Sequence, residues 1–366
     1  MVTHPIFPRS DYASILIRRA GWIGQAAPRA DDIVTMSMFE LTAANAGVWL
    51  AAHGRGSPIL RVEELGGGVS NTVLRVETAD GALVLKQALG KLRVQQDWFS
   101  DRRRALREAD ALRALAPLLP AGAIPELLME DAENCVFAMS AAPNSARTWK
   151  SLLLAGVIEP EVAESIAVLE AAMVAASWHS PDWESRFGDL TVFDELRLDP
   201  YYRATARQHA DLADFFDGLI AETRGRRAAL THGDWSPKNF LVEAGRPMAI
   251  DFEVIHYGDP SFDAAFLLNH LLLKSFHHPE WREKYLYAAQ RYWGAFTSRL
   301  PSSAAWFEDA TLAHLGGLML ARVDGKSPAE YLGCESRERV RGFARELILK
   351  RPRTIEEAFE RRRACA

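Results

Sequence analysis

The spacing of hydrophobic residues changes along the chain and predicts a small sheet followed by a larger helical part. Alternation of apolar and polar residues is typical of strands, whereas a period of three to four residues is typical of helices. The predicted elements of the first part are a helix at 39–52, strands at 60–65, 73–78 and 83–88, a helix that begins at Ser100 or Asp101 and ends before Pro117, and strands at 126–129 and 135–139. This pattern indicates an antiparallel sheet with one inserted helix.

Helical periods dominate the chain beyond residue 142, which predicts an α+β fold with two lobes. We expect an N-lobe at 37–142 and a C-lobe at 143–366, the second mainly helical. Residues 1–36 mix Pro, Arg, Asp and Ser without a sustained period, so we expect a disordered leader there.

Composition and charge exclude several classes of protein. A chain of 366 residues with 48% hydrophobic residues is typical of soluble globular proteins. The net charge of −5 lacks the basic excess of nucleic-acid-binding proteins, so no nucleic acid partner is expected. The longest apolar run, 264–273, is too short to cross a bilayer, and three scattered cysteines suit a reducing cytoplasm. The sequence does not indicate an oligomeric state.

The segment Thr231-His-Gly-Asp-Trp-Ser-Pro-Lys-Asn239 is the strongest chemical signal in the chain. It contains the pattern H-x-D-x-x-x-x-N, and Asp251-Phe-Glu253 follows Asn239 by twelve residues. This spacing is used by kinase-type phosphoryl-transfer enzymes. We expect Asp234 to accept the hydroxyl proton of the acceptor, and Asn239 and Asp251 to bind Mg²⁺.

The flanking residues predict how these groups come together. A strand at 240–242, a turn at 243–245 and a second strand at 247–250 form a hairpin between Asn239 and Asp251. His232 is expected to brace the loop by hydrogen bonding. Lys238 either stabilises the migrating phosphoryl group or faces solvent.

A glycine-rich turn between the first two strands is a candidate phosphate-binding loop. Gly66-Gly-Gly-Val-Ser-Asn71-Thr-Val73 fits the pattern G-x-G-x-x-G-x-V, except that Asn71 replaces the last glycine. Asparagine tolerates a positive φ better than other non-glycine residues, so the pattern is weakened but retained. The candidate ATP-binding residues of this turn are Gly66, Gly68, Ser70 and Asn71.

Lys86 in the third strand is expected to contact the phosphates of ATP, because a lysine within an apolar strand requires an anionic partner. Glu108, on the helix that follows, is the candidate that fixes Lys86. Val73 and Val84 are predicted to cover the adenine, and the chain near Met139 to offer backbone hydrogen bonds to it.

These motifs resemble the aminoglycoside phosphotransferase and choline kinase superfamily, whose catalytic loop reads H-G-D-x-x-x-x-N. The resemblance runs from about residue 65 to 269 and implies a protein-kinase-like small-molecule kinase that uses ATP and Mg²⁺. It includes Asp259-Pro-Ser-Phe-Asp263, and it implies that Asp263 supports the catalytic loop from a helix. Asp251-Phe-Glu253 looks like the choline kinase motif, whereas the stretch around Lys86 is similar to methylthioribose kinases.

A small acceptor is expected, because only eleven residues separate Asp251 from Asp263 and leave no room for the activation segment of a protein kinase. The predicted function is phosphorylation of a hydroxyl group on a sugar or amino alcohol. Two alternatives stay open: a nucleotide-binding pseudokinase with a regulatory role, and a resistance kinase that modifies aminoglycosides. The segment Arg322-Val-Asp324-Gly-Lys326 is either an acceptor-binding site or a surface turn.

Overall fold

The computed structural model describes residues 39–66, 70–93 and 100–365. The leader predicted at 1–36 therefore lies outside the described residues, as does Gly68 of the glycine-rich turn. The other candidate site residues all lie within the described ranges.

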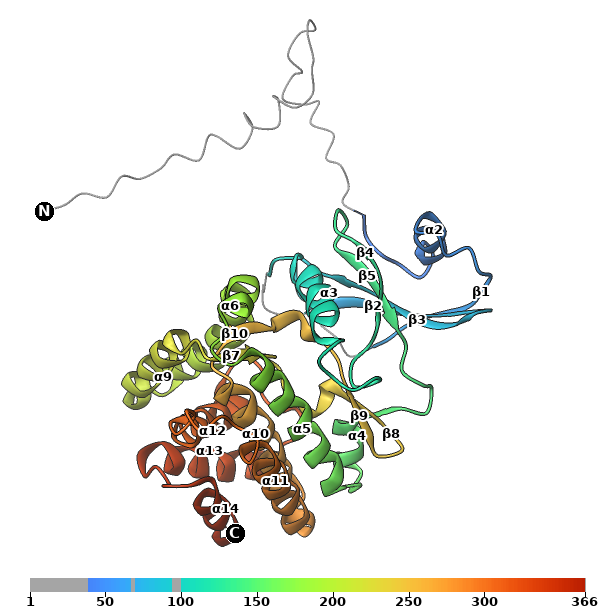
Figure 1. Ribbon diagram of the computed structural model, residues 1–366. Coiled ribbons are helices and arrows are strands. Elements are labelled where there is room, and N and C mark those ends of the chain that lie inside the picture. The colour runs from blue at the N-terminus through green and yellow to red at the C-terminus, as the bar shows by residue number, and fades with distance from the viewer. Residues whose placement is uncertain (1–38, 67–69, 94–99, 366) are drawn as a thin grey trace, which may run out of the picture. The chain divides into compact units, whose positions relative to one another are not determined.

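A five-stranded antiparallel sheet forms the first part of the fold (Figure 1). In sheet order its strands are β1 (Ile59–Glu64), β2 (Asn71–Thr78), β3 (Gly81–Ala88), β5 (Val136–Ser140) and β4 (Leu127–Asp131). Val73 pairs with Lys86 across β2 and β3, and Val84 pairs with Met139 across β3 and β5. Because partners in register and residues two apart share a face, these four side chains lie on one face of the sheet.

In the part of the chain that the structure describes, helices α2 (Ala46–Ala52) and α3 (Arg104–Leu115) accompany the sheet. The prediction that a helix begins at residue 39 was wrong. The Asn45 side chain accepts a hydrogen bond from the backbone N–H of Thr42 at 2.8 Å and donates to the carbonyl of Glu40 at 2.8 Å, which favours a turn instead. Helix α3 begins three residues after Asp101, which accepts from the backbone N–H of Arg103 at 2.9 Å.

The rest of the chain is mainly helical. Its helices are α4 (Trp149–Leu154), α5 (Pro160–Ser177), α6 (Pro181–Phe187), α7 (Thr191–Phe193), a π-helix (Asp194–Arg203), α8 (Ala204–Gln208), α9 (Ala213–Gly225), α10 (Ser261–His277), α11 (Arg282–Thr297), α12 (Phe307–Asp324), α13 (Cys334–Leu349) and α14 (Ile355–Ala364). The predicted two-lobed α+β fold of the protein-kinase type is confirmed. The lobe boundary at residue 142 stays a prediction.

Short strands inside the helical lobe position the catalytic loop. They are β6 (Arg147–Thr148), β7 (Ala229–Thr231), β8 (Phe240–Glu243), β9 (Arg246–Ala249) and β10 (His256–Gly258). The hairpin of β8 and β9 confirms the predicted strand–turn–strand, and the backbone N–H of Ile250 donates to the carbonyl of Asn239 at 2.9 Å. The hairpin register thus brings Asn239 beside the residue that precedes Asp251.

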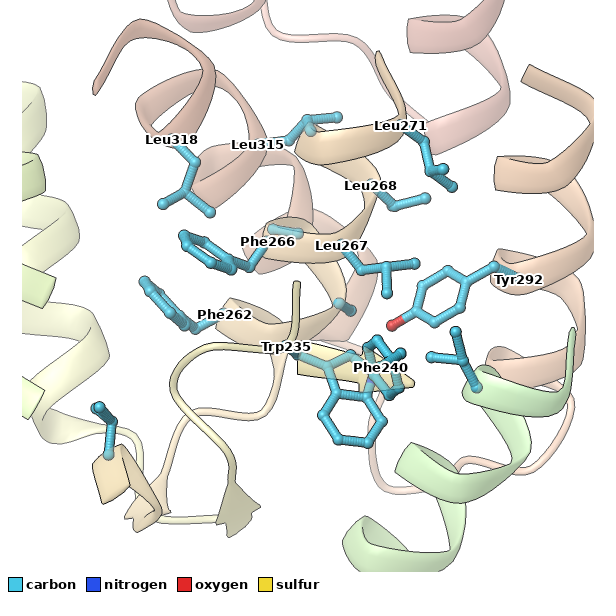
Figure 2. Packing of buried hydrophobic residues seen from close by; sticks show 14 of the residues in the cluster. Trp235, Phe240, Phe262, Phe266, Leu267, Leu268, Leu271, Tyr292, Leu315 and Leu318 are labelled. Atoms are coloured by element: carbon cyan, nitrogen blue, oxygen red, sulfur yellow. The ribbon is translucent and has the colours of Figure 1, made fainter. Parts of the chain in front are cut away.

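Helix α10 lies at the centre of the core of the helical lobe (Figure 2). It is apolar on nearly all sides, as expected for a helix surrounded by other elements. Phe266 of this helix lies near Leu318 of α12, and Leu267 lies on the side that faces Tyr292 of α11. Trp235 and Phe240 pack edge to face, with ring centroids 4.7 Å apart, and anchor the catalytic loop to this core.

Candidate active site

Lys86 of the sheet contacts two carboxylates, Glu108 of α3 beside the sheet and Asp251 of the helical lobe. It is 4% exposed, its Nζ lies 2.6 Å from Oε2 of Glu108, and it forms an ion pair with Asp251. Burial acts to lower the pKa of Lys86, but the charges of Asp251 and Glu108 outweigh it and raise the pKa. Burial likewise acts to raise the pKa of Asp251, and Lys86 and Lys238 reverse this, so the pKa lies below its usual value. Both groups are therefore charged at neutral pH.

Asp251 adopts a left-handed backbone conformation, with φ of +70° and ψ of +56°, directly before a 3₁₀ turn over Phe252–Val254. Aspartate tolerates this region better than most other residues. The turn directs the two carboxylates to different partners. Asp251 forms an ion pair with Lys86, whereas Glu253 accepts hydrogen bonds at the start of β2.

Asp263 supports the catalytic loop from the first turn of α10. Its two carboxylate oxygens accept hydrogen bonds from the backbone N–H groups of His232, at 2.5 Å, and of Gly233, at 2.9 Å. Gly233 has φ of +77°, and a Cβ at this position would lie 2.7 Å from Cγ1 of Val254. The loop therefore requires glycine between His232 and Asp234.

Gly233→Ala is expected to lower the free energy of unfolding by about 2–4 kcal/mol, because a left-handed alanine and an overpacked contact each cost about 1–3 kcal/mol. Gly245→Ala is the matched control. Gly245 has φ of +74°, but a Cβ there would meet no atom within 4 Å, so only the backbone cost remains. Urea unfolding of both variants measures the difference, and equal losses would contradict the steric explanation of the motif.

His232 is fully buried, and its hydrogen bonds define one neutral tautomer. Nδ1 accepts from the backbone N–H of Asp234 at 3.2 Å, so Nε2 carries the proton that it donates to the carbonyl of Ile250 at 3.1 Å. Burial lowers the pKa of His232 to about 4. The side chain thus connects the loop to the end of β9, in keeping with the bracing role expected from the sequence.

The lowered pKa makes His232 a source of acid lability. The unfolded chain binds the proton below about pH 6.5 and the folded protein only below about pH 4, so stability falls as the pH drops through this window. The expected loss is about 3 kcal/mol at pH 4 relative to pH 7. His232→Gln cannot titrate, so urea unfolding at several pH values should give a flatter profile for this variant. An unchanged profile would contradict the burial of a neutral imidazole.

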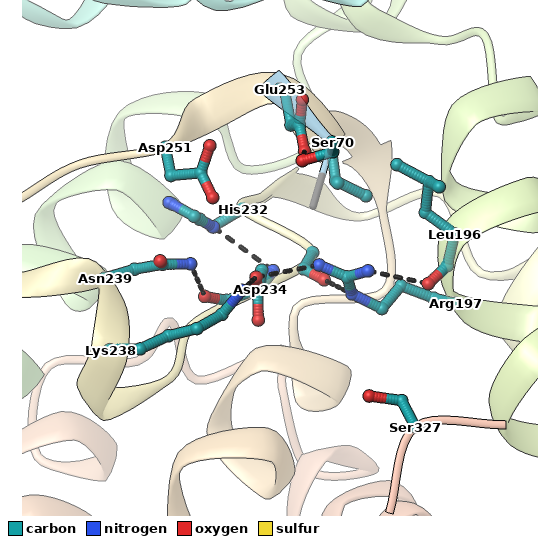
Figure 3. A network of polar contacts seen from close by, with 12 residues as sticks. Ser70, Leu196, Arg197, His232, Asp234, Lys238, Asn239, Asp251, Glu253 and Ser327 are labelled. Carbon is teal, nitrogen blue, oxygen red and sulfur yellow. Dashed lines mark hydrogen bonds and ion pairs between the residues drawn. The ribbon is translucent and has the colours of Figure 1, made fainter. Parts of the chain in front are cut away.

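Asp234 is held between two cations (Figure 3). Its Oδ2 lies 2.9 Å from Nη2 of Arg197 and 2.8 Å from Nζ of Lys238. Burial acts to raise the pKa of Asp234, and the two cations lower it below the usual value, so the group is ionised. Asn239 donates through Nδ2 to the backbone carbonyl of Asp234 at 2.9 Å.

Glu253 of the helical lobe connects that lobe to the start of β2. It accepts hydrogen bonds from Ser70 Oγ, Asn71 Nδ2 and Arg104 Nε, each at 3.0 Å. The expectation that Asn71 substitutes for glycine through a positive φ was wrong, because Asn71 begins strand β2 and serves as a side-chain donor to Glu253. At Gly66, in contrast, a Cβ would meet no atom within 4 Å.

A cavity of about 280 Å³ opens beside Asp234 in the helical lobe. It is lined by Lys150, Tyr201, Asp234, Pro237, Lys238, Phe266, His270, Lys274, Arg322, Ser327, Glu330 and Tyr331. Of the segment at 322–326, only Arg322 is part of this lining. Asp324 instead pairs with Arg341 at 2.7 Å, and Lys326 pairs with Asp199 at 2.8 Å.

The sequence profile of the phosphotransferase enzyme family matches residues 61–307, about two thirds of the chain. The chain belongs to this family. The match includes the sheet, the catalytic loop and α10. The motifs predicted this membership, and the profile confirms it.

Two methylthioribose kinases are similar to this phosphotransferase. Methylthioribose kinase 2 of Oryza sativa subsp. japonica is 28% identical over 245 residues, which span 59% of this chain and 57% of the rice protein. Methylthioribose kinase of Geobacillus thermodenitrificans is 26% identical over 326 residues, 79% of this chain and 80% of the bacterial protein.

Among solved structures, an amicoumacin kinase in complex with AMP-PNP and Ca²⁺ has the same fold, with a TM-score of 0.51 and 13% identity. The superposition covers 85% of this chain and 95% of that chain. In the part of this phosphotransferase that the structure describes, every helix is too short or too polar to span a bilayer.

Arg197, Arg104 and Glu253 of the phosphotransferase were missed in the sequence. Arg197 comes from the π-helix, 37 residues before Asp234, and no motif marks it. Arg104 is one of three consecutive arginines, which read as a solvated helix start, yet its side chain is fully buried. Glu253 had a signal, since it completes the Asp251-Phe-Glu253 motif, but its partners lie in the other lobe.

Proposed function

We propose that this phosphotransferase transfers the γ-phosphoryl group of ATP to a hydroxyl group of a small metabolite in a Mg²⁺-dependent reaction. One observation carries the proposal: Lys86 of the sheet contacts Asp251, which the β8–β9 hairpin positions beside the loop of Asp234 and Asn239. A phosphate-binding lysine, a metal carboxylate and a base within one site are the components that phosphoryl transfer requires.

The nucleotide would lie against the face of the sheet that carries Val73, Val84, Lys86 and Met139. The valines and the methionine offer apolar contact to the base, and Lys86 offers a charge to the phosphates. Glu108 holds Lys86 from α3 at 2.6 Å. Because the side chains of Ser70 and Asn71 are occupied by Glu253, their contacts with phosphate would come from the backbone.

The residues proposed for Mg²⁺ fit the preferences of this ion. Asp251 is ionised, and the amide of Asn239 uses its nitrogen for Asp234, which leaves its carbonyl oxygen for a cation. Mg²⁺ is commonly held by one or two protein oxygens together with substrate phosphates and water. When bound, Mg²⁺ neutralises phosphate charge and orients the γ-phosphoryl group.

Asp234 is proposed as the base. The acceptor oxygen forms a bond to the γ-phosphorus, the bond from that phosphorus to the β-phosphate bridging oxygen breaks, and the hydroxyl proton moves to Asp234. Arg197 and Lys238 both contact Oδ2, so Oδ1 is proposed as the atom that receives the proton. A weak base suffices, because a loose transition state depends mainly on alignment and charge neutralisation. Lys238, whose Nζ lies 2.8 Å from Oδ2 of Asp234, is proposed to stabilise the migrating phosphoryl group.

A screen of hydroxyl compounds that reads ADP formation tests this function. The panel holds sugars, amino alcohols, hydroxy acids, sugar phosphates and aminoglycosides, each assayed with ATP or GTP and with Mg²⁺ or EDTA. We expect at least one compound to raise ADP formation above the background hydrolysis, and EDTA to abolish the increase. ADP formation that is independent of metal would contradict the proposal, as would ATP binding without transfer to any compound.

A further inference from the structure

The cavity beside Asp234 contains more cations than its carboxylates neutralise. Among the described residues, its lining includes Lys150, Lys238, Lys274 and Arg322 but only two carboxylates, Asp234 and Glu330. Asp234 already pairs with Lys238 and Arg197, and Glu330 already pairs with Lys150. Among the described residues, neither Lys274 nor Arg322 forms an ion pair with a carboxylate of the cavity wall, and the charge of Glu330 acts on both without direct contact.

Lys274 is fully buried on α10, within the core helix. Its Nζ donates to the backbone carbonyl of His270 at 3.2 Å and lies 5.3 Å from the ring centroid of Tyr331. Among the described residues, no carboxylate lies within ion-pair distance of it. A buried ammonium group without an anionic partner is costly, so an unpaired lysine at this position requires an explanation.

Arg322 on α12 lies in the same wall and is 8% exposed. Its Nη1 donates to Oγ of Ser327 at 2.9 Å, whereas its Nε is buried without a hydrogen-bond partner in the described part of the protein. The hydroxyl group of Tyr331 is also buried and unpaired. Two cations and a hydroxyl donor thus line one cavity with unused hydrogen-bonding capacity.

We propose that the acceptor carries an anionic group, a carboxylate or a phosphate, which binds to Lys274, Arg322 and the hydroxyl group of Tyr331 while the acceptor's own hydroxyl faces Asp234. This inference rests on the proposed function. Charge-assisted hydrogen bonds from Lys and Arg are the strongest protein contacts to such groups. A polycationic aminoglycoside would meet like charges in the same cavity.

The size and electrostatics of the cavity agree with this substrate class. Its volume of about 280 Å³ lies near the lower end for ligand pockets and suits a compact metabolite. Burial, with the charges of Lys150 and Arg322, lowers the pKa of Lys274 to about 7. A bound anion would supply the counter-charge that favours the ammonium form.

Calorimetric titration with matched neutral and anionic alcohols tests the proposal. The probes are ribose, ribonate and ribose 5-phosphate, and glycerol, glycerate and glycerol 3-phosphate. The protein is first saturated with AMP-PNP and Mg²⁺, so that a phosphate probe cannot occupy the nucleotide site. We expect an anionic probe to bind at least about tenfold more tightly than its neutral counterpart, and the carboxylate and phosphate members identify which anion is preferred.

Variants locate the anion. Lys274→Met and Arg322→Met are each expected to weaken binding of the preferred anion by at least about tenfold. Lys326→Met is the matched control, because Lys326 lies outside the cavity and pairs with Asp199, and it should leave binding unchanged. Thermal unfolding of Lys274→Met distinguishes anion binding from a purely structural role of Lys274. The proposal predicts an unchanged or raised midpoint, because the substitution removes an unpaired buried charge. A structural role predicts a lowered midpoint, and that result would count against the proposal.

The proposal is overturned if neutral probes bind as tightly as the anions, if no anion binds, or if both cavity variants retain wild-type affinity. Failure of the proposed function gives a different result. Turnover of neutral alcohols alone would contradict this inference but agree with the proposed kinase function. Anion binding without ADP formation from any probe or panel compound would support the anion-binding site and contradict the proposed function.

Discussion

Replacement of Asp234 by asparagine is expected to lower kcat by about three orders of magnitude, because a positioned general base contributes about 10²–10⁴-fold. Asparagine keeps the shape of the side chain but cannot accept the hydroxyl proton. The expected loss corresponds to about 4 kcal/mol of transition-state stabilisation. ATP binding should persist, since the proposed nucleotide contacts come from the sheet and from Lys86. The ADP-release assay gives kcat, and calorimetry gives the affinity for ATP.

Asp199→Asn is the matched control for this experiment. Asp199 is also an aspartate paired with cations, Lys326 and Arg207, but it is partly exposed and lies outside the cavity. It should retain wild-type turnover. If Asp234→Asn retains most of its kcat while Mg²⁺ and ATP are saturating, the assignment of the base is wrong.

Asp251→Asn is expected to raise the Mg²⁺ concentration for half-maximal activity by at least about 100-fold. Loss of a hydrogen bond that orients a metal ligand costs about 10–100-fold in metal affinity, and loss of the ligand itself costs more. The substitution also removes one of the two anionic partners of Lys86, but Glu108 remains to hold it. Activity measured across a Mg²⁺ titration, at saturating ATP, should recover in part at high metal concentration.

Glu253→Gln provides the comparison, because this carboxylate lies two residues away and contacts Ser70, Asn71 and Arg104. The account predicts a higher KM for ATP in this variant, with the Mg²⁺ dependence of the wild type. An identical Mg²⁺ response of Asp251→Asn and the wild type would remove Asp251 from the metal site.

The local arrangement of the proposed catalytic loop was predictable because its residues are close in sequence. His232, Asp234 and Asn239 lie within eight residues, and the alternation at 240–250 was sufficient to predict the hairpin that brings Asp251 back. Lys86 was found for a physical reason, since an apolar strand rarely tolerates a lysine. The resemblance supplied Asp263, and its hydrogen bonds to the loop backbone explain why a carboxylate is needed there.

The remaining site residues were not predictable because their partners are distant in sequence. Arg197 reaches Asp234 from a π-helix, and nothing in its local sequence distinguishes it from a surface arginine. Lys274 was also not predictable, because it follows an apolar run and its sequence suggests the polar end of a helix. Only the fold shows that it lines the cavity beside Asp234. The prediction for Asn71 was wrong because its place in the glycine-rich pattern suggested a positive φ, whereas Asn71 begins β2 and its side chain donates to Glu253.

Transfer of label from [γ-³²P]ATP tests the central claim most directly and does not require a known acceptor. The protein is incubated with labelled ATP, Mg²⁺ and the small-molecule fraction of a cell extract, and the products are separated by chromatography. The account predicts a labelled organic phosphate with the wild type that is absent with Asp234→Asn and with EDTA. Label that appears only as inorganic phosphate, or equally with Asp234→Asn, would contradict it.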